Sequence, residues 1–255
     1  MSLAEALAEL DTLARRLRRD CPWDREQTAK TIVPHTVEEA YEVADAALSD
    51  DDAKLLDELG DLLYQVYFLA LLLEEKGDGD LESVARSIHD KLVRRHPHVF
   101  GGEEIATAGA VRSRWERVKR EQEGREGVFH DVPESLPGLV FARKVQRRAA
   151  AVGFEYPDVD GAFGDLESEL GELREELHGG SDERRAAELG DLLFACVNVA
   201  RRIGADPQLE LRRATQRFRD RVGEAERLAA EAGKTWTELP LEEQDSWFDR
   251  AKENE

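Results

Sequence analysis

The hexapeptide Glu-Leu-Gly-Asp-Leu-Leu occupies residues 58–63 of this chain and recurs unchanged at residues 188–193, an offset of 130 (188 − 58). Two glutamates three residues apart precede each copy at that same offset: Glu39 and Glu42 before the first, Glu169 and Glu172 before the second. The stretches between the acids have diverged, since residues 43–57 and 173–187 agree at Asp52 and Asp182 alone. Identity of the acids amid this divergence indicates two related halves in which the acids share a role.

Apolar residues recur at helical spacing through most of the chain, and Ala, Leu, Glu and Arg dominate its composition. No run of alternating β-branched residues predicts a sheet. The expected helices cover residues 3–19, 37–48, 53–76, 81–95, 110–121, 138–152, 162–178, 182–203, 208–232 and 242–252. The sequence therefore predicts an all-α fold.

Residues 124–137 are rich in Gly, Pro and charge and lack a helical period, which is typical of a linker. Together with the internal repeat, this stretch predicts an N-terminal domain at 1–124, a linker at 125–137 and a C-terminal domain at 138–255. A chain of 255 residues is long enough for two such domains, each with its own core.

The chain is strongly acidic, with a formal net charge of −20 and a pI of about 4.8. Such a surface repels a phosphate backbone, so a nucleic acid polymer is not an expected partner, whereas a small phosphorylated ligand is compatible with metal ions. The N-terminal residues mix charges with apolar side chains, and the longest apolar stretch, Leu62–Leu73, contains Gln65, so no signal peptide or membrane partner is expected. Two cysteines, Cys21 and Cys196, favour a reduced cytoplasm over a disulfide framework.

The spacing of the acids suggests a metal site in each half. Residues three apart on a helix share a face, and the polar turn at residues 49–52 would join two helices into an antiparallel hairpin. Four carboxylates would then meet at one level, where they repel unless a cation lies among them. Oxygen ligands of this kind suit Mg²⁺, with Mn²⁺ as an alternative. The competing interpretation is a duplicated structural hairpin with solvated acidic faces.

Further motifs accompany the acids. Residues 38–42 and 58–61 together read Glu-Glu-x-x-Glu…Glu-x-x-Asp, and residues 21–24 read Cys-Pro-Trp-Asp. Residues 94–100 read Arg-Arg-His-Pro-His-Val-Phe, and residues 152–154 read Val-Gly-Phe. In this combination, which extends over almost the whole chain, the sequence resembles the MazG-type all-α nucleoside triphosphate pyrophosphohydrolases, and the two-domain bacterial members in particular.

The resemblance implies tandem MazG domains, each contributing to a four-helix-bundle-like assembly in a homodimer. It also implies Mg²⁺-dependent hydrolysis of NTPs and dNTPs to a nucleoside monophosphate and pyrophosphate. Carboxylate-bound Mg²⁺ fits this chemistry, because it neutralises the triphosphate and activates water for in-line attack. The chain has no Walker-type Gly-x-x-x-x-Gly-Lys loop, so phosphate binding would fall to metals and side chains.

Candidate site residues follow from the repeat and from the resemblance. The predicted metal ligands are Glu39, Glu42, Glu58, Asp61, Glu169, Glu172, Glu188 and Asp191. The resemblance assigns most of the catalysis to the C-terminal half, with Glu172, Glu188 and Asp191 as catalytic residues. Pairs four residues apart follow each acidic repeat and are candidates to bind the nucleotide, or else amphipathic surface: Lys91 with Arg95, Arg217 with Arg221, Trp115 with Lys119, and Phe248 with Lys252. The resemblance alone adds Lys144, Arg148 and Asn198.

The C-terminal half departs from the family pattern at two positions. Ser168 stands where the first half has Glu38, which would weaken the charge of the site or its handling of the attacking water. Phe248 stands where family members commonly have Trp, and Trp247 is displaced by one. In the other direction, Asn198 gives the C-terminal half a polar group over a stretch where residues 68–72 of the first half are entirely apolar.

Other functions remain open at this stage. Within the same fold, a narrower dUTPase-like or dCTPase-like specificity, or phosphoribosyl-ATP hydrolysis, is compatible with the acids, and no base-reading motif separates these activities. A catalytically weak nucleotide- and metal-binding regulator is a further alternative. A purely structural acidic bundle would show no effect of Mg²⁺ on its stability.

Overall fold

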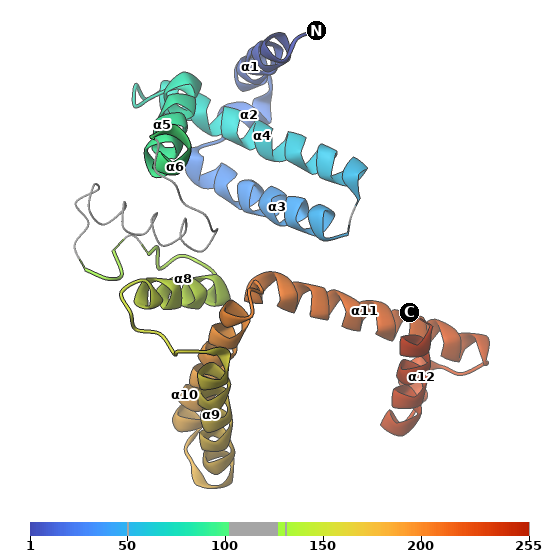
Figure 1. The fold of residues 1–255 in the computed structure, drawn as a ribbon. Helices are drawn as coiled ribbons and strands as arrows, with labels where there is room; N and C mark the ends of the chain where they lie inside the picture. The colour runs from blue at the N-terminus through green and yellow to red at the C-terminus, as the bar shows by residue number, and fades with distance from the viewer. Residues whose placement is uncertain (50, 102–126, 131, 255) are drawn as a thin grey trace. The chain divides into compact units, whose positions relative to one another are not determined.

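The computed structural model describes residues 1–49, 51–101, 127–130 and 132–254. The chain divides into two compact units, Met1–Val118 and Lys119–Glu255, here called the N-unit and the C-unit. The described residues form helices and no strand, so the all-α prediction is confirmed (Figure 1). The predicted helix at 110–121 and the predicted domain limits near residue 124 fall on residues outside those ranges, and the limits stay a prediction.

The N-unit is organised around the antiparallel hairpin of α3 (Ala29–Leu48) and α4 (Asp52–Glu74), which pack along each other. Its other described helices are α1 (Leu3–Asp20), α2 (Pro22–Glu26), α5 (Leu81–Arg95) and α6 (Pro97–Phe100). Apolar side chains of the hairpin form a small core of Ile32, Phe68 and Leu72. This core lies at the end of the hairpin remote from its turn.

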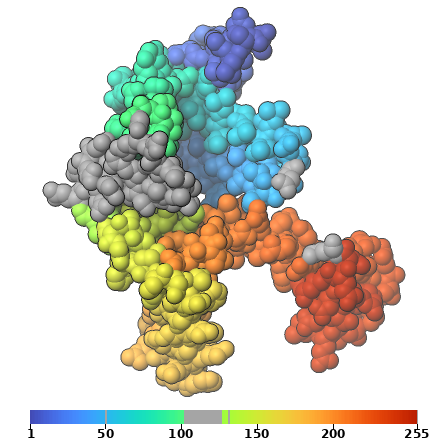
Figure 2. Space-filling view, in the orientation of Figure 1, coloured from blue at the N-terminus to red at the C-terminus, as the bar shows by residue number. Residues whose placement is uncertain are grey.

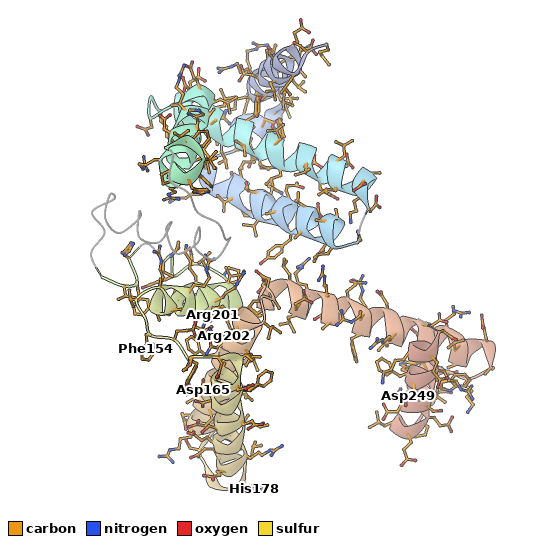
Figure 3. All side chains as sticks on the ribbon, in the orientation of Figure 1. Phe154, Asp165, His178, Arg201, Arg202 and Asp249 are labelled. Atoms are coloured by element: carbon orange, nitrogen blue, oxygen red, sulfur yellow. The ribbon has the colours of Figure 1, made fainter. Side chains whose placement is uncertain are left out.

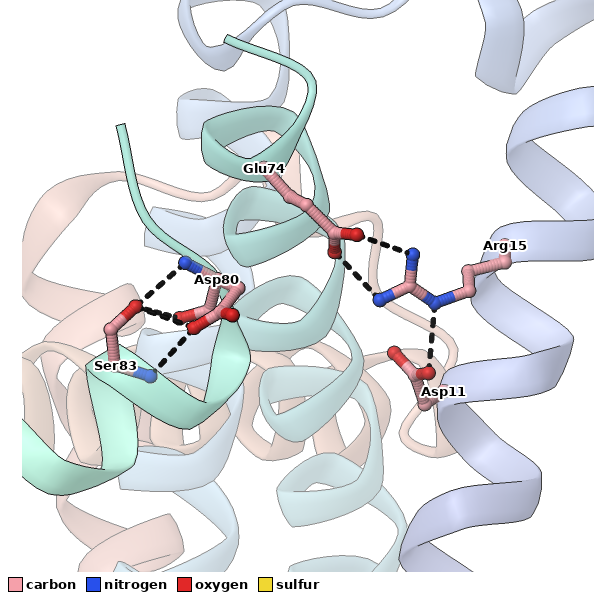
Figure 4. Close-up of polar contacts among 5 residues, drawn as sticks. All are labelled: Asp11, Arg15, Glu74, Asp80 and Ser83. Atoms are coloured by element: carbon pink, nitrogen blue, oxygen red, sulfur yellow. Dashed lines mark hydrogen bonds and ion pairs between the residues drawn. The ribbon is translucent and has the colours of Figure 1, made fainter. Parts of the chain in front are cut away.

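Ion pairs fasten α1 to the end of α4. The guanidinium of Arg15 donates to both carboxylate oxygens of Glu74, at 3.0 and 2.6 Å, and to Asp11 at 2.8 Å (Figure 4). Near this contact Asp80 caps α5, because its carboxylate accepts from the backbone of Ser83 while the Ser83 hydroxyl accepts from the backbone of Asp80. The ion pair thus restrains the end of α4, and the cap restrains the start of α5.

The C-unit repeats the hairpin with α9 (Val159–Gly179) and α10 (Asp182–Arg202). Both helices begin 130 residues after their counterparts in the N-unit, so the internal repeat corresponds to a structural repeat. The remaining elements are α8 (Gly138–Ala150), α11 (Pro207–Glu231), the short 3-10 helix η1 (Trp236–Glu238) and α12 (Leu241–Glu253). Helix α8 packs on α10 and α11, and α12 packs on α11.

The first hairpin helix begins earlier than the sequence predicts. Pro34 and Thr36 suggest a start at Val37, yet α3 begins at Ala29 and contains Pro34. Two effects override the proline signal: locally, Thr28 and Thr31 form a reciprocal cap, with bonds of 2.8 and 3.3 Å, and through packing on α4, Ile32 is buried in the core. The missing N–H of Pro34 affects one bond near the helix start.

No helix among the described residues has the length and apolar character needed to cross a membrane.

Candidate metal centre

The acidic repeat of the C-unit converges on one level of the α9–α10 hairpin. Glu169 and Glu172 lie one helical turn apart on α9, and Glu188 comes from α10. Each of these three residues offers a carboxylate oxygen within 4.8 Å of those of the other two. Asp191 is the fourth member, since its charge helps to raise the pKa of Glu169. The structure therefore brings all four predicted acids of this half together.

The N-unit hairpin holds a matching cluster. Carboxylate oxygens of Glu39, Glu58 and Asp61 lie within 4.8 Å of one another. Glu42 interacts with both Glu39 and Glu58, by charge and by hydrogen bonding. The same four positions thus supply the acids of both clusters, but the three carboxylates within 4.8 Å differ: the N-unit trio includes Asp61, and the C-unit trio includes Glu172 in place of Asp191.

The electrostatics of the clusters favour a cation. Desolvation first, and then repulsion by the neighbouring acids, raises the pKa of Glu39 in the N-unit and of Glu169 in the C-unit. A bound Mg²⁺ holds its oxygens at about 2.1 Å, so two oxygens on one ion are at most about 4.2 Å apart. Oxygens already within 4.8 Å reach that geometry through small side-chain rotations. The donor set therefore fits a hard divalent cation.

Of three neighbours of the C-unit cluster, Ser168 was noted from the sequence, whereas Asp165 and Tyr156 were not. Asp165 lies one turn before Glu169, and its charge also raises the pKa of that glutamate. Tyr156 donates a hydrogen bond to Asp165 at 2.9 Å, and Ser168 donates one to Glu172 at 3.1 Å. In the N-unit the position of Asp165 is taken by His35 (165 − 130), which lies 3.3 Å from Glu38. The two clusters therefore share their four acids and differ in their surroundings.

A second polar group lies further along α10. Arg201 donates to Asn198 at 2.6 Å and forms a two-point ion pair with Glu155, at 2.7 and 2.6 Å. Hydrogen bonding with Arg201 lowers the pKa of Glu155. Figure 3 shows His178 at the turn of the α9–α10 hairpin and Asp165, Arg201 and Arg202 toward its opposite end. Asn198 was predicted as a nucleotide ligand, whereas Arg201 and Glu155 were not.

The two hairpins differ most in the positions of the apolar core. In the N-unit Ile32, Phe68 and Leu72 are 2%, 1% and 5% exposed. At an offset of 130 the C-unit has Ala162, Asn198 and Arg202. One hairpin thus fills this end with hydrocarbon, and the other presents a small side chain, an amide and a guanidinium. The two hairpins therefore differ in polarity at this end.

Helix α8 brings further predicted residues to α10. Gln146 donates to the backbone carbonyl of Phe194 at 2.8 Å and so ties the two helices together. Lys144 and Arg148 lie on the same helix, Lys144 half-buried and Arg148 buried with partners of its own. Their predicted contact with a nucleotide stays a prediction.

The remaining C-unit candidates gather on α11 and α12, apart from the acids. Phe218 of α11 and Phe248 of α12 stack with ring centroids 5.7 Å apart, and the Lys252 ammonium lies 4.8 Å from the Phe248 ring. Arg217 and Arg221 lie on α11 beside this aromatic pair. Figure 2 shows α12, in red, at the end of α11 that is remote from the α9–α10 hairpin. The predicted contact of these side chains with a nucleotide stays a prediction.

The N-unit candidates are less complete. Lys91 and Arg95 share α5, which packs on α4, and Arg95 has partners of its own. Trp115 and Lys119 lie outside the described residues.

Comparison with known proteins identifies the family. Residues 27–100 match the model of the MazG nucleotide pyrophosphohydrolase domain. The chain is 39% identical over 254 residues to the nucleoside triphosphate pyrophosphohydrolase of Escherichia coli K12, covering 96% of each protein. The chain belongs to the MazG family. A second MazG relative, the nucleoside triphosphate pyrophosphohydrolase/pyrophosphatase MazG of Thermotoga maritima, is 37% identical over 249 residues, with 96% of this chain and 94% of that protein covered.

A solved MazG-related protein from Thermotoga maritima matches 45% of this chain and 99% of its own, at 29% identity and a TM-score of 0.40. The MazG model spans the α3–α4 hairpin of the N-unit, while the full-length relatives extend the MazG match over both units.

Proposed function

We propose that this MazG protein hydrolyses nucleoside triphosphates, both NTPs and dNTPs, to a nucleoside monophosphate and pyrophosphate, with Mg²⁺ as cofactor. The proposal rests on the carboxylate cluster of Glu169, Glu172 and Glu188, whose oxygens lie within 4.8 Å of one another. Its two full-length relatives named above carry nucleoside triphosphate pyrophosphohydrolase in their names. In a chain of net charge −20, bound metal ions would supply positive charge for a triphosphate.

We assign catalysis to the C-unit. Glu172, Glu188 and Asp191 would hold Mg²⁺ together with Glu169, and bound Mg²⁺ would supply neutralisation of the triphosphate and acidification of a water. The carboxylates orient the attacking water in line with the α–β anhydride, whose P–O bond breaks as one water is consumed. Ser168 keeps Glu172 in place through its hydroxyl. The polar end of the hairpin, with Asn198, supports this choice of unit, because the N-unit has an apolar core there.

Product analysis tests the activity. Purified protein incubated with a panel of NTPs and dNTPs is expected to release monophosphate and pyrophosphate in equal amounts, only when Mg²⁺ is present. Separation of the products by ion-exchange chromatography measures both. Release of orthophosphate in place of pyrophosphate, or no release from any nucleotide by folded protein, would refute the proposal and favour a binding regulator.

We also propose that the protein is a homodimer. Leu59 and Leu63 in the first hexapeptide, and Leu189 and Leu193 in the second, are 39–50% exposed in the single chain. A Cβ added at Gly60 or Gly190 would meet no atom within 4 Å. This face of each hairpin is therefore not covered by another part of the chain at these two glycines. Two helices cannot bury such a face alone, and pairing with the hairpin of a second copy would complete a four-helix bundle.

A single charge on this face is expected to separate the subunits. Leu193→Asp should change the mass in solution from twice the 28.7 kDa chain mass to one chain, because the dimer would bury an unpaired carboxylate. Light scattering coupled to size-exclusion chromatography measures the mass. Leu3→Asp, at an exposed leucine on α1, is the matched control and should leave the dimer intact. A monomeric wild-type protein would contradict the proposal.

A further inference from the structure

Arg201 joins two side chains that otherwise have no link. One terminal nitrogen of its guanidinium donates both to Glu155 and to Asn198, and the other pairs with the second oxygen of Glu155 at 2.6 Å. The side chains of Arg201 and Glu155 are only 14% and 20% exposed. A two-point, mostly shielded pair of this kind holds a guanidinium in one orientation. Glu155 therefore fixes Arg201, and Arg201 in turn contacts the amide of Asn198.

The chemistry of arginine decides which way that amide faces. A guanidinium carries donors and no acceptor, so the Asn198 atom facing Arg201 has to be its oxygen. The Nδ2 group then points away from Arg201, and it has no hydrogen-bond acceptor among the described residues. The Nδ2 group of Asn198 is therefore oriented to donate a hydrogen bond to a ligand at this end of the hairpin.

The position of Asn198 relative to the acids suggests which part of a nucleotide it meets. Asn198 follows Asp191 by seven residues on α10, which places it on the same face and about 10 Å further along the axis. That displacement is comparable to the distance from metal-bound phosphates to the nucleoside end of a nucleotide. A donor at this point matches an acceptor oxygen or nitrogen on the sugar or the base.

The N-unit lacks all three members of this group. At the offset of 130 it has Phe68 for Asn198, Leu71 for Arg201 and Arg25 for Glu155. Phe68 and Leu71 are buried. The donor, the residue that orients it and the carboxylate that holds that residue therefore occur together in one unit and are together absent from the other.

We propose that Arg201, held by Glu155, is a positioning residue that turns the Asn198 amide to donate to an acceptor on the sugar or base of the nucleotide. The inference rests on the proposed nucleotide hydrolysis in the C-unit. Loss of Arg201 frees the amide to rotate and weakens the contact equally in the bound substrate and in the transition state. The result is a raised KM with little change in kcat.

The test is a double-mutant cycle. Asn198→Ala and Arg201→Met are each expected to raise KM about tenfold, the value of one hydrogen bond, and the double variant should be no worse than either. Arg201→Lys retains a donor and should recover part of the loss. Arg184→Met is the matched control, because Arg184 lies on the same helix but pairs with Glu176 near the hairpin turn, at 3.0 Å, and its KM should stay near wild type. Fully additive effects, or an unchanged KM in Arg201→Met, would overturn the proposal.

The substrate panel separates the two sources of the acceptor. Equal KM increases for all bases, with a difference between NTPs and dNTPs, indicate a sugar oxygen. Increases confined to some bases indicate a base atom.

Binding of Mg²⁺ with an α,β-methylene nucleotide, measured by calorimetry, needs no turnover. If the wild type fails to hydrolyse nucleotides but binds this analogue, the same cycle on Kd still tests Arg201. If the wild type neither hydrolyses nucleotides nor binds the analogue, both the proposed function and this inference are wrong. If the wild type binds the analogue and Arg201→Met binds it with the same Kd, only this inference is wrong.

Discussion

Replacing Glu172 with glutamine is expected to lower kcat about a thousand-fold while the protein remains folded. The substitution keeps the size of the side chain and removes one charge from three carboxylates within 4.8 Å. Metal-based stabilisation of a transition state supplies several kcal/mol, and each 1.36 kcal/mol is a factor of ten in rate. Steady-state kinetics with pyrophosphate detection measures kcat, and circular dichroism checks the fold.

Glu42→Gln provides the matched control, because Glu42 occupies the same place in the N-unit cluster. Its kcat should remain within about a factor of two of wild type if the C-unit carries catalysis. The reverse result, with activity lost in Glu42→Gln and kept in Glu172→Gln, would move the catalytic assignment to the N-unit.

Removal of divalent cations is expected to abolish turnover and to lower Tm. A ligand at a hundred times its Kd stabilises a protein by about 2.7 kcal/mol, which corresponds to about 5–10 °C for a chain of this size. In the two acidic clusters neighbouring carboxylates repel one another, and a bound cation would relieve that repulsion. Differential scanning fluorimetry, with EDTA and then with added Mg²⁺, measures the change.

The size of this metal effect should depend on pH. The pKa values of Glu39 and Glu169 are raised in the folded protein, so between the ordinary and the raised value the folded state binds more protons than the unfolded state. These groups therefore make the metal-free protein less stable as pH rises through that window. Above the window the clusters are fully ionised and the cation relieves the most repulsion. The Tm increase on adding Mg²⁺ should be larger at pH 8 than at pH 5, and an equal increase would argue against binding at these acids.

The sequence alone was sufficient to anticipate the hairpins and the meeting of their acids. Spacing of three on a helix places Glu169 beside Glu172, and a short polar turn between two helices brings Glu188 opposite them. Both effects are local, because they depend on helix periodicity and turn length. The roles of these residues in metal binding and catalysis remain predictions.

Features that depend on tertiary contacts could not be anticipated in the same way. Glu155 lies in a loop without any period, and only the packing of that loop on α10 brings it to Arg201, 46 residues later. The start of α3 was misplaced because the burial of Ile32 is decided by α4, not by the residues around Pro34. The path of α11, which leads α12 away from the α9–α10 hairpin, likewise has no local signal.

The apolar core of the N-unit makes the two halves difficult to interconvert. Phe68→Asn alone would place an unpaired amide beside Ile32 and Leu72, which costs about 1–3 kcal/mol. Leu71→Arg alone would bury a guanidinium near Arg18 and Arg25, where the neighbouring carboxylate, Glu75, already pairs with Arg18. Only the joint replacement of positions 25, 68 and 71 reproduces a balanced group. After duplication, this epistasis would have kept the two halves on separate evolutionary paths even while their acids stayed the same.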